Sequence, residues 1–198
     1  MIFRYLYGMN DKPLKSCSKE SCNECEIHSK VTCHFNPGQF VQFYLILLLP
    51  LTTGSFGVYN YSSNSFIIWV MTFPLFFLLL GIRVLCTHCP HYKESSRIIR
   101  CWANYGVPKL WKYRPTPMNF YEKAILISGF IFIWGFPVIF ISLTQEWILL
   151  SGYLISVFLF FFLLNRISCR KCINFSCPLN KVSNKVREVF LSYNNNSL

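Results

Sequence analysis

Ten cysteines and four histidines are the side chains of this sequence best suited to chemistry, and they fall in three groups. The groups lie in CSKESCNECEIHSKVTCH (residues 17–34), in CTHCPHY (86–92) with one cysteine beyond it, and in CRKCINFSC (169–177). Thiolates and imidazoles at short spacings are typical zinc ligands, and cysteine thiolates also hold iron–sulfur clusters. The candidate metal ligands are Cys17, Cys22, Cys25, His28, Cys33, Cys86, Cys89, His91, Cys101, Cys169, Cys172 and Cys177.

The first group permits two metal chemistries. Cys17, Cys22 and Cys25 have the C-x4-C-x2-C spacing that begins a plant-type iron–sulfur motif, but Cys33 follows too soon to complete it. Zinc fits equally well, with Cys22, Cys25 and Cys33 joined by one of the two histidines at 28 and 34. A third possibility is a reduced arm that binds no metal.

The second and third groups each begin with a C-x2-C pair that directly follows a long apolar stretch. Four such stretches cover residues 39–59, 66–86, 124–144 and 147–165, close to the 20 or so residues that cross a bilayer. Only 14% of residues are charged, where soluble domains have about a quarter. We therefore expect an all-α integral membrane protein with four transmembrane helices and a small cysteine-rich cytosolic cap. The first stretch, which contains Gln42 and Pro50, could instead be re-entrant or interfacial.

The distribution of Lys and Arg predicts the orientation. All 19 lie in residues 1–38, 87–123 and 166–198 or, like Arg83, at the boundary of a span, whereas the opposite loops contain none. Because cationic loops stay in the cytoplasm, both termini should be cytoplasmic. Cytoplasmic thiols are kept reduced, so this location favours metal or redox sites over disulfides.

The same topology suggests how the cysteines meet. The second and fourth spans run in the same direction, so Cys86 and Cys89 could join Cys169 and Cys172 in one four-thiolate site. Cys101, Cys177 and His91 would then complete a site with the first group or stay free. The Cys-Pro pairs at 89–90 and 177–178 favour iron–sulfur, but the bacterial ferredoxin run is absent and histidine is not its usual ligand. Zinc is preferred.

The formal charge of +11 needs no nucleic acid to explain it, because the bias toward cytoplasmic Lys and Arg accounts for much of the excess. Besides the lipid bilayer, anionic headgroups and an acidic soluble protein are the expected partners. Residues 95–104 could form a short helix, and the apolar positions of 182–193 fit one helical face.

The conservative interpretation is a metal-binding membrane protein whose cap docks a partner. Two alternatives are a redox protein that passes electrons between an iron–sulfur centre and a quinone or partner enzyme, and a soft-metal carrier. The lack of cysteines deep in the spans counts against the carrier. The sequence contains no hydrolase or nucleotide-binding motif, and it leaves open whether the protein is an enzyme.

Overall fold

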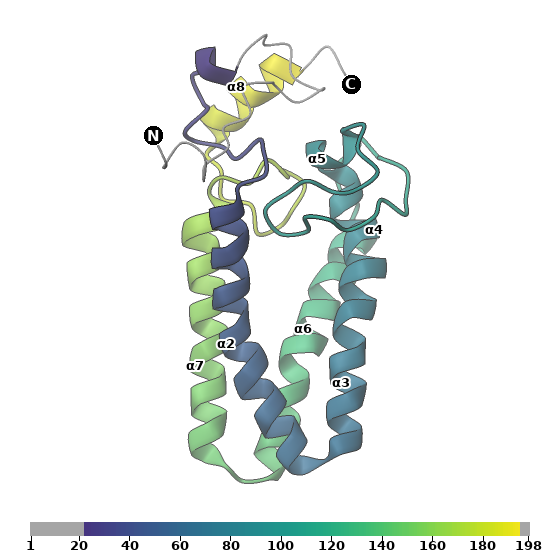
Figure 1. The fold of residues 1–198 in the computed structure, drawn as a ribbon, viewed down its shortest axis with the longest axis vertical. Coiled ribbons are helices and arrows are strands. Elements are labelled where there is room, and N and C mark those ends of the chain that lie inside the picture. The colour runs from purple at the N-terminus through teal and green to yellow at the C-terminus, as the bar shows by residue number, and fades with distance from the viewer. Residues whose placement is uncertain (1–21, 195–198) are drawn as a thin grey trace.

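The computed structural model describes residues 22–194, and its regular secondary structure within that range is helical, with no β-strand. Figure 1 shows four long helices side by side with a cap over one end. The elements are η1 (Cys22–Glu24), α2 (Pro37–Tyr61), α3 (Ser63–Leu75), η2 (Phe76–Gly81), α4 (Ile82–Val84), η3 (Cys86–His88), α5 (Pro90–Lys93), α6 (Phe120–Leu143), α7 (Trp147–Leu164), η4 (Asn165–Cys169) and α8 (Asn184–Asn194).

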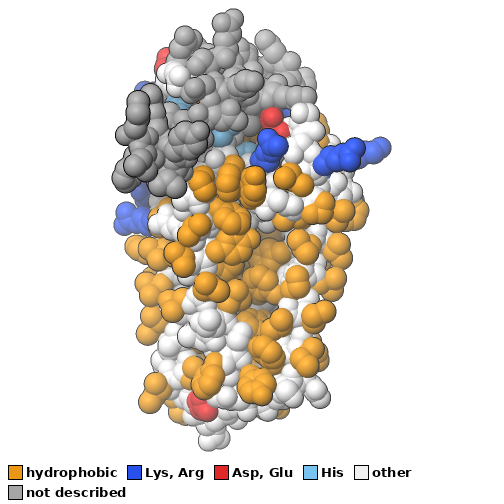
Figure 2. Space-filling view, in the orientation of Figure 1, with side chains coloured by type: hydrophobic (Ala, Val, Ile, Leu, Met, Phe, Trp, Pro, Cys, Tyr) orange, Lys and Arg blue, Asp and Glu red, His pale blue; other side chains and the backbone are white. Residues whose placement is uncertain are grey.

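Four helical stretches are long and apolar enough to cross a membrane: Pro37–Tyr61, Ser63–His88, Phe120–Leu143 and Trp147–Cys169. At 1.5 Å per residue each reaches about 35–39 Å, more than the roughly 30 Å hydrocarbon core. Large apolar side chains are exposed along all four, and they cover the middle of the molecule in Figure 2. The first has the lowest mean hydropathy, 1.6 against 2.3–2.4, yet it is one continuous helix of 25 residues.

Glycines let the helices approach closely, as is common where no hydrophobic effect drives packing in lipid. Helix α2 contacts α3, α6 and α7. A Cβ at Gly57 would lie 2.4 Å from Ile141, and one at Gly54 would lie 2.9 Å from Tyr153. In α6, a Cβ at Gly129 would lie 1.9 Å from the ring of Phe76, so that ring occupies the space of the missing side chain.

One aromatic side chain satisfies the carbonyl that Pro137 leaves without a donor, and a second donates to the next carbonyl. A proline has no N–H, so the carbonyl four residues earlier, that of Ile133, lacks its helical donor. The indole Nε1 of Trp69 donates to this carbonyl at 2.9 Å, and the hydroxyl of Tyr153 donates to the carbonyl of Trp134, also at 2.9 Å. Buried polar backbone is thereby paired inside the bundle, as an apolar environment requires.

The cap consists of residues 22–36, 85–119 and 170–194, all at one end of the bundle. The apolar face predicted for 182–193 is present in α8, where Val186, Val189 and Phe190 pack against Ile27 and neighbouring apolar residues of the cap. Residues 95–104 are not the short helix that we expected. They fold into an irregular hairpin with the amide of Ile99 on the carbonyl of Val107, since Gly106 adopts a φ of 86° and reverses the chain.

Candidate metal centre

Both spans that lead to a C-x2-C pair change their winding just before it. The second span passes from α3 into the π-helix η2, and the fourth passes from α7 into the π-helix η4. Short π segments within α-helices are rare and are frequently found at functional sites. The second span then extends through the turn η3, which contains Cys86, and η4 itself ends at Cys169. The two helical stretches end at His88 and Cys169, two and four residues beyond the predicted span ends, and they thus carry the first thiol of each pair.

Both pairs lie at one cavity of about 170 Å³, where the bundle meets the cap. The parallel course of the second and fourth spans predicted one four-thiolate site here. The structure places these four thiols at one cavity, but no described group of three could hold a metal ion. The hairpin 94–108 brings in one more cysteine, and the turn before α8 brings in another. The metal-ligating residue types at the cavity are Cys86, Cys89, His91, Cys101, Cys169, Cys172 and Cys177.

The opposite wall of this six-cysteine cavity is apolar and comes from all four spans. Its lining includes Phe43 of α2, Phe77 of η2, Phe130 of α6 and Leu164 of α7. Each of these lies on the bundle side of the thiols, so the cavity connects a sulfur-rich surface with the hydrocarbon-like interior. An environment of this kind excludes water and strengthens the electrostatic interactions of any charged group within it.

Backbone groups that follow four of the thiols lower the pKa of those thiols. Each lies two residues after its cysteine: His91 after Cys89, Ala103 after Cys101, Asn174 after Cys172 and Leu179 after Cys177. Asn104 adds two further contacts, from its amide to Cys101 Sγ at 3.3 Å and from its side-chain Nδ2 to Cys86 Sγ at 3.5 Å. Such bonds favour the thiolate form and tune the potential of sulfur-ligated metal.

Burial nevertheless keeps the thiols protonated when no cation is present. It raises the pKa of Cys172 to about 12, and it raises the pKa of Cys89 well above the ordinary thiol value, with the neighbouring thiol of Cys172 adding to the effect. The pKa of Cys101 and that of Cys177 are raised for the same reason. A cation that binds here must displace these protons and compensate the buried negative charge.

The thiols surround a space rather than converge on a point. Within residues 22–194, no three Cys, His, Asp or Glu side chains stand in an arrangement that could hold one metal ion. Tetrahedral zinc with bonds of about 2.3 Å needs sulfurs about 3.8 Å apart. A metal–sulfide cluster occupies a volume of its own and takes thiolates from around its surface. The cavity therefore places thiol side chains around one space, but the described residues do not form a site that could hold a single metal ion.

The N-terminal group lies beside this cavity, within the cap. Cys22 Sγ is 3.3 Å from His34 Nε2, whereas Cys25 and Cys33 pack with the apolar residues beneath α8 and His28 is partly exposed. Cys17 lies outside the described residues.

His91 connects the N-terminal group to the cavity. Its pKa is lowered to about 4 by burial and by the nearby His34, against a hydrogen bond to the backbone of Thr32. Thr32 in turn bridges to the chain at Cys172, and its amide donates to the carbonyl of Lys171 at 2.7 Å. The N-terminal segment is therefore positioned by backbone contacts to the second C-x2-C pair.

A buried carboxylate that sequence analysis did not identify fastens the loop 94–119 to the spans. Glu122 forms ion pairs with Arg114 and with His88, whose Nε2 is 3.2 Å from its carboxylate. Arg114 also donates to the carbonyl of Arg83 at 2.7 Å and to the hydroxyl of Thr87 at 3.1 Å. His88 is thus engaged away from the thiols. The signal was present in the sequence, because Asn119 and Glu122 form a capping box before an apolar run.

Two asparagines were also missed, and both hold the segment that carries the last three cysteines. Asn174 donates through Nδ2 to the carbonyl of Leu85 at 2.9 Å, which ties the third cysteine group to the end of the second span. Asn180 donates to the carbonyl of Cys172 at 2.7 Å and to that of Asn174 at 3.0 Å. The sequence offers no specific signal for either role.

Comparison of the chain with protein-family models, curated proteins and solved structures gives no match.

Proposed function

We propose that this is a membrane protein whose six-cysteine cavity binds a thiolate-ligated metal centre at the cytosolic end of the spans. The observation that carries the proposal is the meeting of both C-x2-C pairs with Cys101 and Cys177 around one enclosed space. The backbone groups that lower the pKa of four of these thiols support it, because they lower the cost of holding thiolates away from water. The concentration of Lys and Arg at the same end supports the cytosolic location.

Between the two metals considered, an iron–sulfur cluster agrees better with the shape of the cavity. The thiols are spread around about 170 Å³ instead of converging, and four of six would suffice for a cluster. Zinc, which the sequence alone favours, would require the sulfurs to close on one point. The mixed Cys22–His34 contact in the cap is where zinc remains the better candidate, since imidazole is an ordinary zinc ligand.

The role that follows is one-electron transfer at the membrane surface. A reduced soluble protein with an acidic surface would dock on exposed cations such as Arg97, Arg100 and Lys112, and would lose one electron to the cluster. The cluster would return to its oxidised form by passing that electron to an acceptor at the apolar wall, such as a quinone. A soft-metal carrier is less compatible, because Ile133, Trp134 and Phe160 fill the core beyond the cavity.

Metal analysis of matched cysteine variants tests the proposal. Protein purified without oxygen should contain iron and acid-labile sulfide, and Cys172→Ser should lose at least half of both. Cys33→Ser is the control, because Cys33 packs beneath α8 outside the cavity lining, and it should keep the cluster. Equal losses in the two variants would argue against the cavity as the site. Stoichiometric zinc without sulfide would leave the site but exclude electron transfer.

A further inference from the structure

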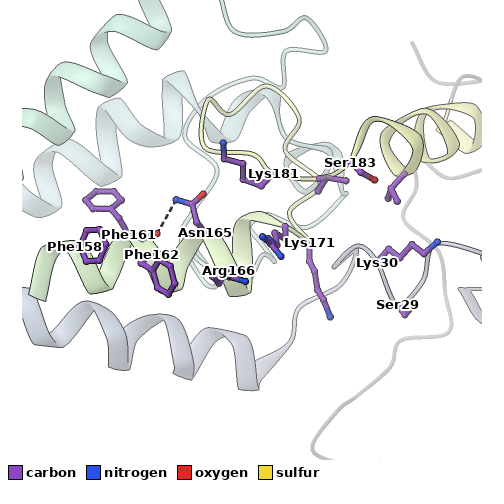
Figure 3. Close-up of a pocket in the computed structure, with 13 residues that line it drawn as sticks. Ser29, Lys30, Phe158, Phe161, Phe162, Asn165, Arg166, Lys171, Lys181 and Ser183 are labelled. Carbon is purple, nitrogen blue, oxygen red and sulfur yellow. Dashed lines mark hydrogen bonds between the residues drawn. The ribbon is translucent and has the colours of Figure 1, made fainter. Parts of the chain in front are cut away.

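A groove on the outside of the molecule, beside the fourth span, combines apolar and cationic side chains, as a site for an anionic lipid requires. It has a volume of about 930 Å³ and runs from the exposed side of α7 onto the cap. Figure 3 shows phenylalanines along α7 and cationic side chains around and beyond its end. The lining combines Phe158, Phe161 and Phe162 with Lys30, Arg166, Arg170, Lys171 and Lys181.

Among residues 22–194, nothing compensates the charge of this groove. Its described lining holds five Lys and Arg and no Asp or Glu, and none of the five is in an ion pair with another described residue. Arg166, Arg170, Lys171, Lys181 and Lys30 are all exposed. The described part of the groove therefore presents five cations that an anion could bind.

The spacing along α7 matches an amphiphile rather than a free anion. Arg166 lies eight residues after Phe158, which is about 12 Å along the helix. Phe158 is 67% exposed on the apolar face, and the guanidinium of Arg166 lies 5.4 Å from the ring centre of Phe162. A phosphate at Arg166 would thus have its acyl chains run down over the exposed phenylalanines, at the depth where headgroups meet hydrocarbon.

One buried polar atom in the groove also lacks a partner. Asn165 donates through Nδ2 to the carbonyl of Phe161 at 3.1 Å, but its Oδ1 is buried and accepts no hydrogen bond from the described residues. A buried acceptor without a donor costs about 1–3 kcal/mol, so a ligand that supplies a donor gains affinity. The hydroxyl groups of a glycerol headgroup are donors of this kind.

We propose that the groove between α7 and the cap binds an anionic phospholipid, with its phosphate on Arg166 and Lys181 and its acyl chains on Phe158 and Phe162. Basic pockets at the cytoplasmic ends of transmembrane helices take headgroups of this class. The site is separate from the six-cysteine cavity, whose lining shares none of these residues. The lipid would bridge the fourth span to the segment that carries Cys169, Cys172 and Cys177.

Native mass spectrometry of the purified full-length protein in neutral detergent tests the lipid site, with phosphatidylglycerol and phosphatidylcholine added in competition. We expect one phosphatidylglycerol to be retained at least about tenfold more tightly than phosphatidylcholine. The double variant R166Q/K181Q should weaken its binding about 25-fold, since each cation near a membrane surface contributes about a factor of five. The matched control is R97Q/K112Q, which removes one exposed arginine and one exposed lysine from the loop 94–119 and should change binding less than about twofold.

Three results would overturn the proposal. Equal losses in both double variants would indicate general attraction to a basic surface. Equal retention of the two lipids would remove the requirement for anionic charge. Displacement of phosphatidylglycerol by millimolar inorganic phosphate would show that the cations hold a free anion and that the phenylalanines contribute nothing. Each result leaves the metal content of the protein unaffected, so this test is independent of the proposed metal centre.

Discussion

The two ends of the helical bundle are packed differently. At the end away from the cap, α2 and α3 meet at Ser62 and α6 and α7 are joined by a short turn at Gln145, and glycines allow close contact between backbones. At the cap end the spans change to π-helical winding and enclose a cavity with six thiols. At the first end Gly54 and Gly57 lie close to side chains of the neighbouring helices, whereas the second end surrounds a cavity of about 170 Å³.

This difference shows that the packing that stabilises the bundle and the residues of the candidate site lie in different halves of the molecule. The distal half depends on apolar packing and on hydrogen bonds within the bundle, such as that from Trp69 to the backbone of Ile133. The cap half has three segments with little regular structure, held by asparagine side chains, one buried carboxylate and contacts around the cavity. We expect perturbations at the cavity to loosen the cap and leave the distal half folded.

Loss of the metal centre should have the largest effect and should be confined to the cap. Cys89→Ser combined with Cys172→Ser removes one thiol from each C-x2-C pair. A centre bound at 100 times its dissociation constant contributes about 2.7 kcal/mol, so we expect proteolysis within 94–119 and 170–183 to accelerate about tenfold or more. Mass spectrometry of the fragments would check this. Faster cleavage within the spans themselves would contradict the separation of the two ends.

Glu122→Gln should have the next largest effect, by releasing the loop 94–119 from the spans. The change removes the carboxylate charge that pairs with Arg114 and that lies 3.2 Å from His88 Nε2, and both contacts are partly or wholly buried. We expect the free energy of unfolding to fall by about 2–3 kcal/mol in a detergent titration. Glu146→Gln, at the exposed distal turn, is the control and should change it by less than about 0.5 kcal/mol. Similar losses for both would mean that the network does not hold the cap.

Gly129→Ala tests the close packing of the bundle. The added Cβ would lie 1.9 Å from the ring of Phe76, so the ring or the helix must shift, at a cost of about 1–3 kcal/mol in the free energy of unfolding. Gly135→Ala in the same helix has no neighbour within 4 Å and should be neutral or slightly stabilising. If the two variants had equal stability in the detergent titration, the contact with Phe76 would not be tight.

Trp69→Phe should have the smallest effect, about 1 kcal/mol, because it removes one hydrogen bond to a buried carbonyl. Pro137→Ala can show whether the hydrogen bond causes this loss of stability, because it restores a backbone amide that can donate to the carbonyl of Ile133 within α6. In the Pro137→Ala background the loss caused by Trp69→Phe should shrink by about 1 kcal/mol. A loss of the same size in both backgrounds would show that Trp69 acts by packing alone.

The spans and the meeting of the two C-x2-C pairs were predictable because each depends on local patterns. Apolar length marks the four helices, and the order of the spans places Cys86 and Cys169 at the same end of the bundle. The positions of Cys101 and Cys177 were not predictable. They depend on a hairpin closed between Ile99 and Val107 and on the side chain of Asn180, which are contacts that no short window of sequence reveals.

The exits of the spans differ from the prediction for a related reason. Hydropathy ends the fourth span at residue 165, but the helical winding continues as η4 to Cys169, because the carbonyls near its end find partners in the cap.

Glu122 was missed for another reason. A carboxylate beside an apolar run looks like an interfacial residue, and its partner Arg114 reaches it only through the fold of the loop.

Electron paramagnetic resonance of protein purified without oxygen and reduced with dithionite tests the central claim most directly. An iron–sulfur cluster in the six-cysteine cavity predicts a signal from one unpaired electron per protein, together with visible absorption that bleaches on reduction. Both should fall by at least half in Cys172→Ser and be kept in Cys33→Ser. A wild-type protein that contains no iron, or whose signal is unchanged by Cys172→Ser, would contradict the assignment of the cluster to this cavity.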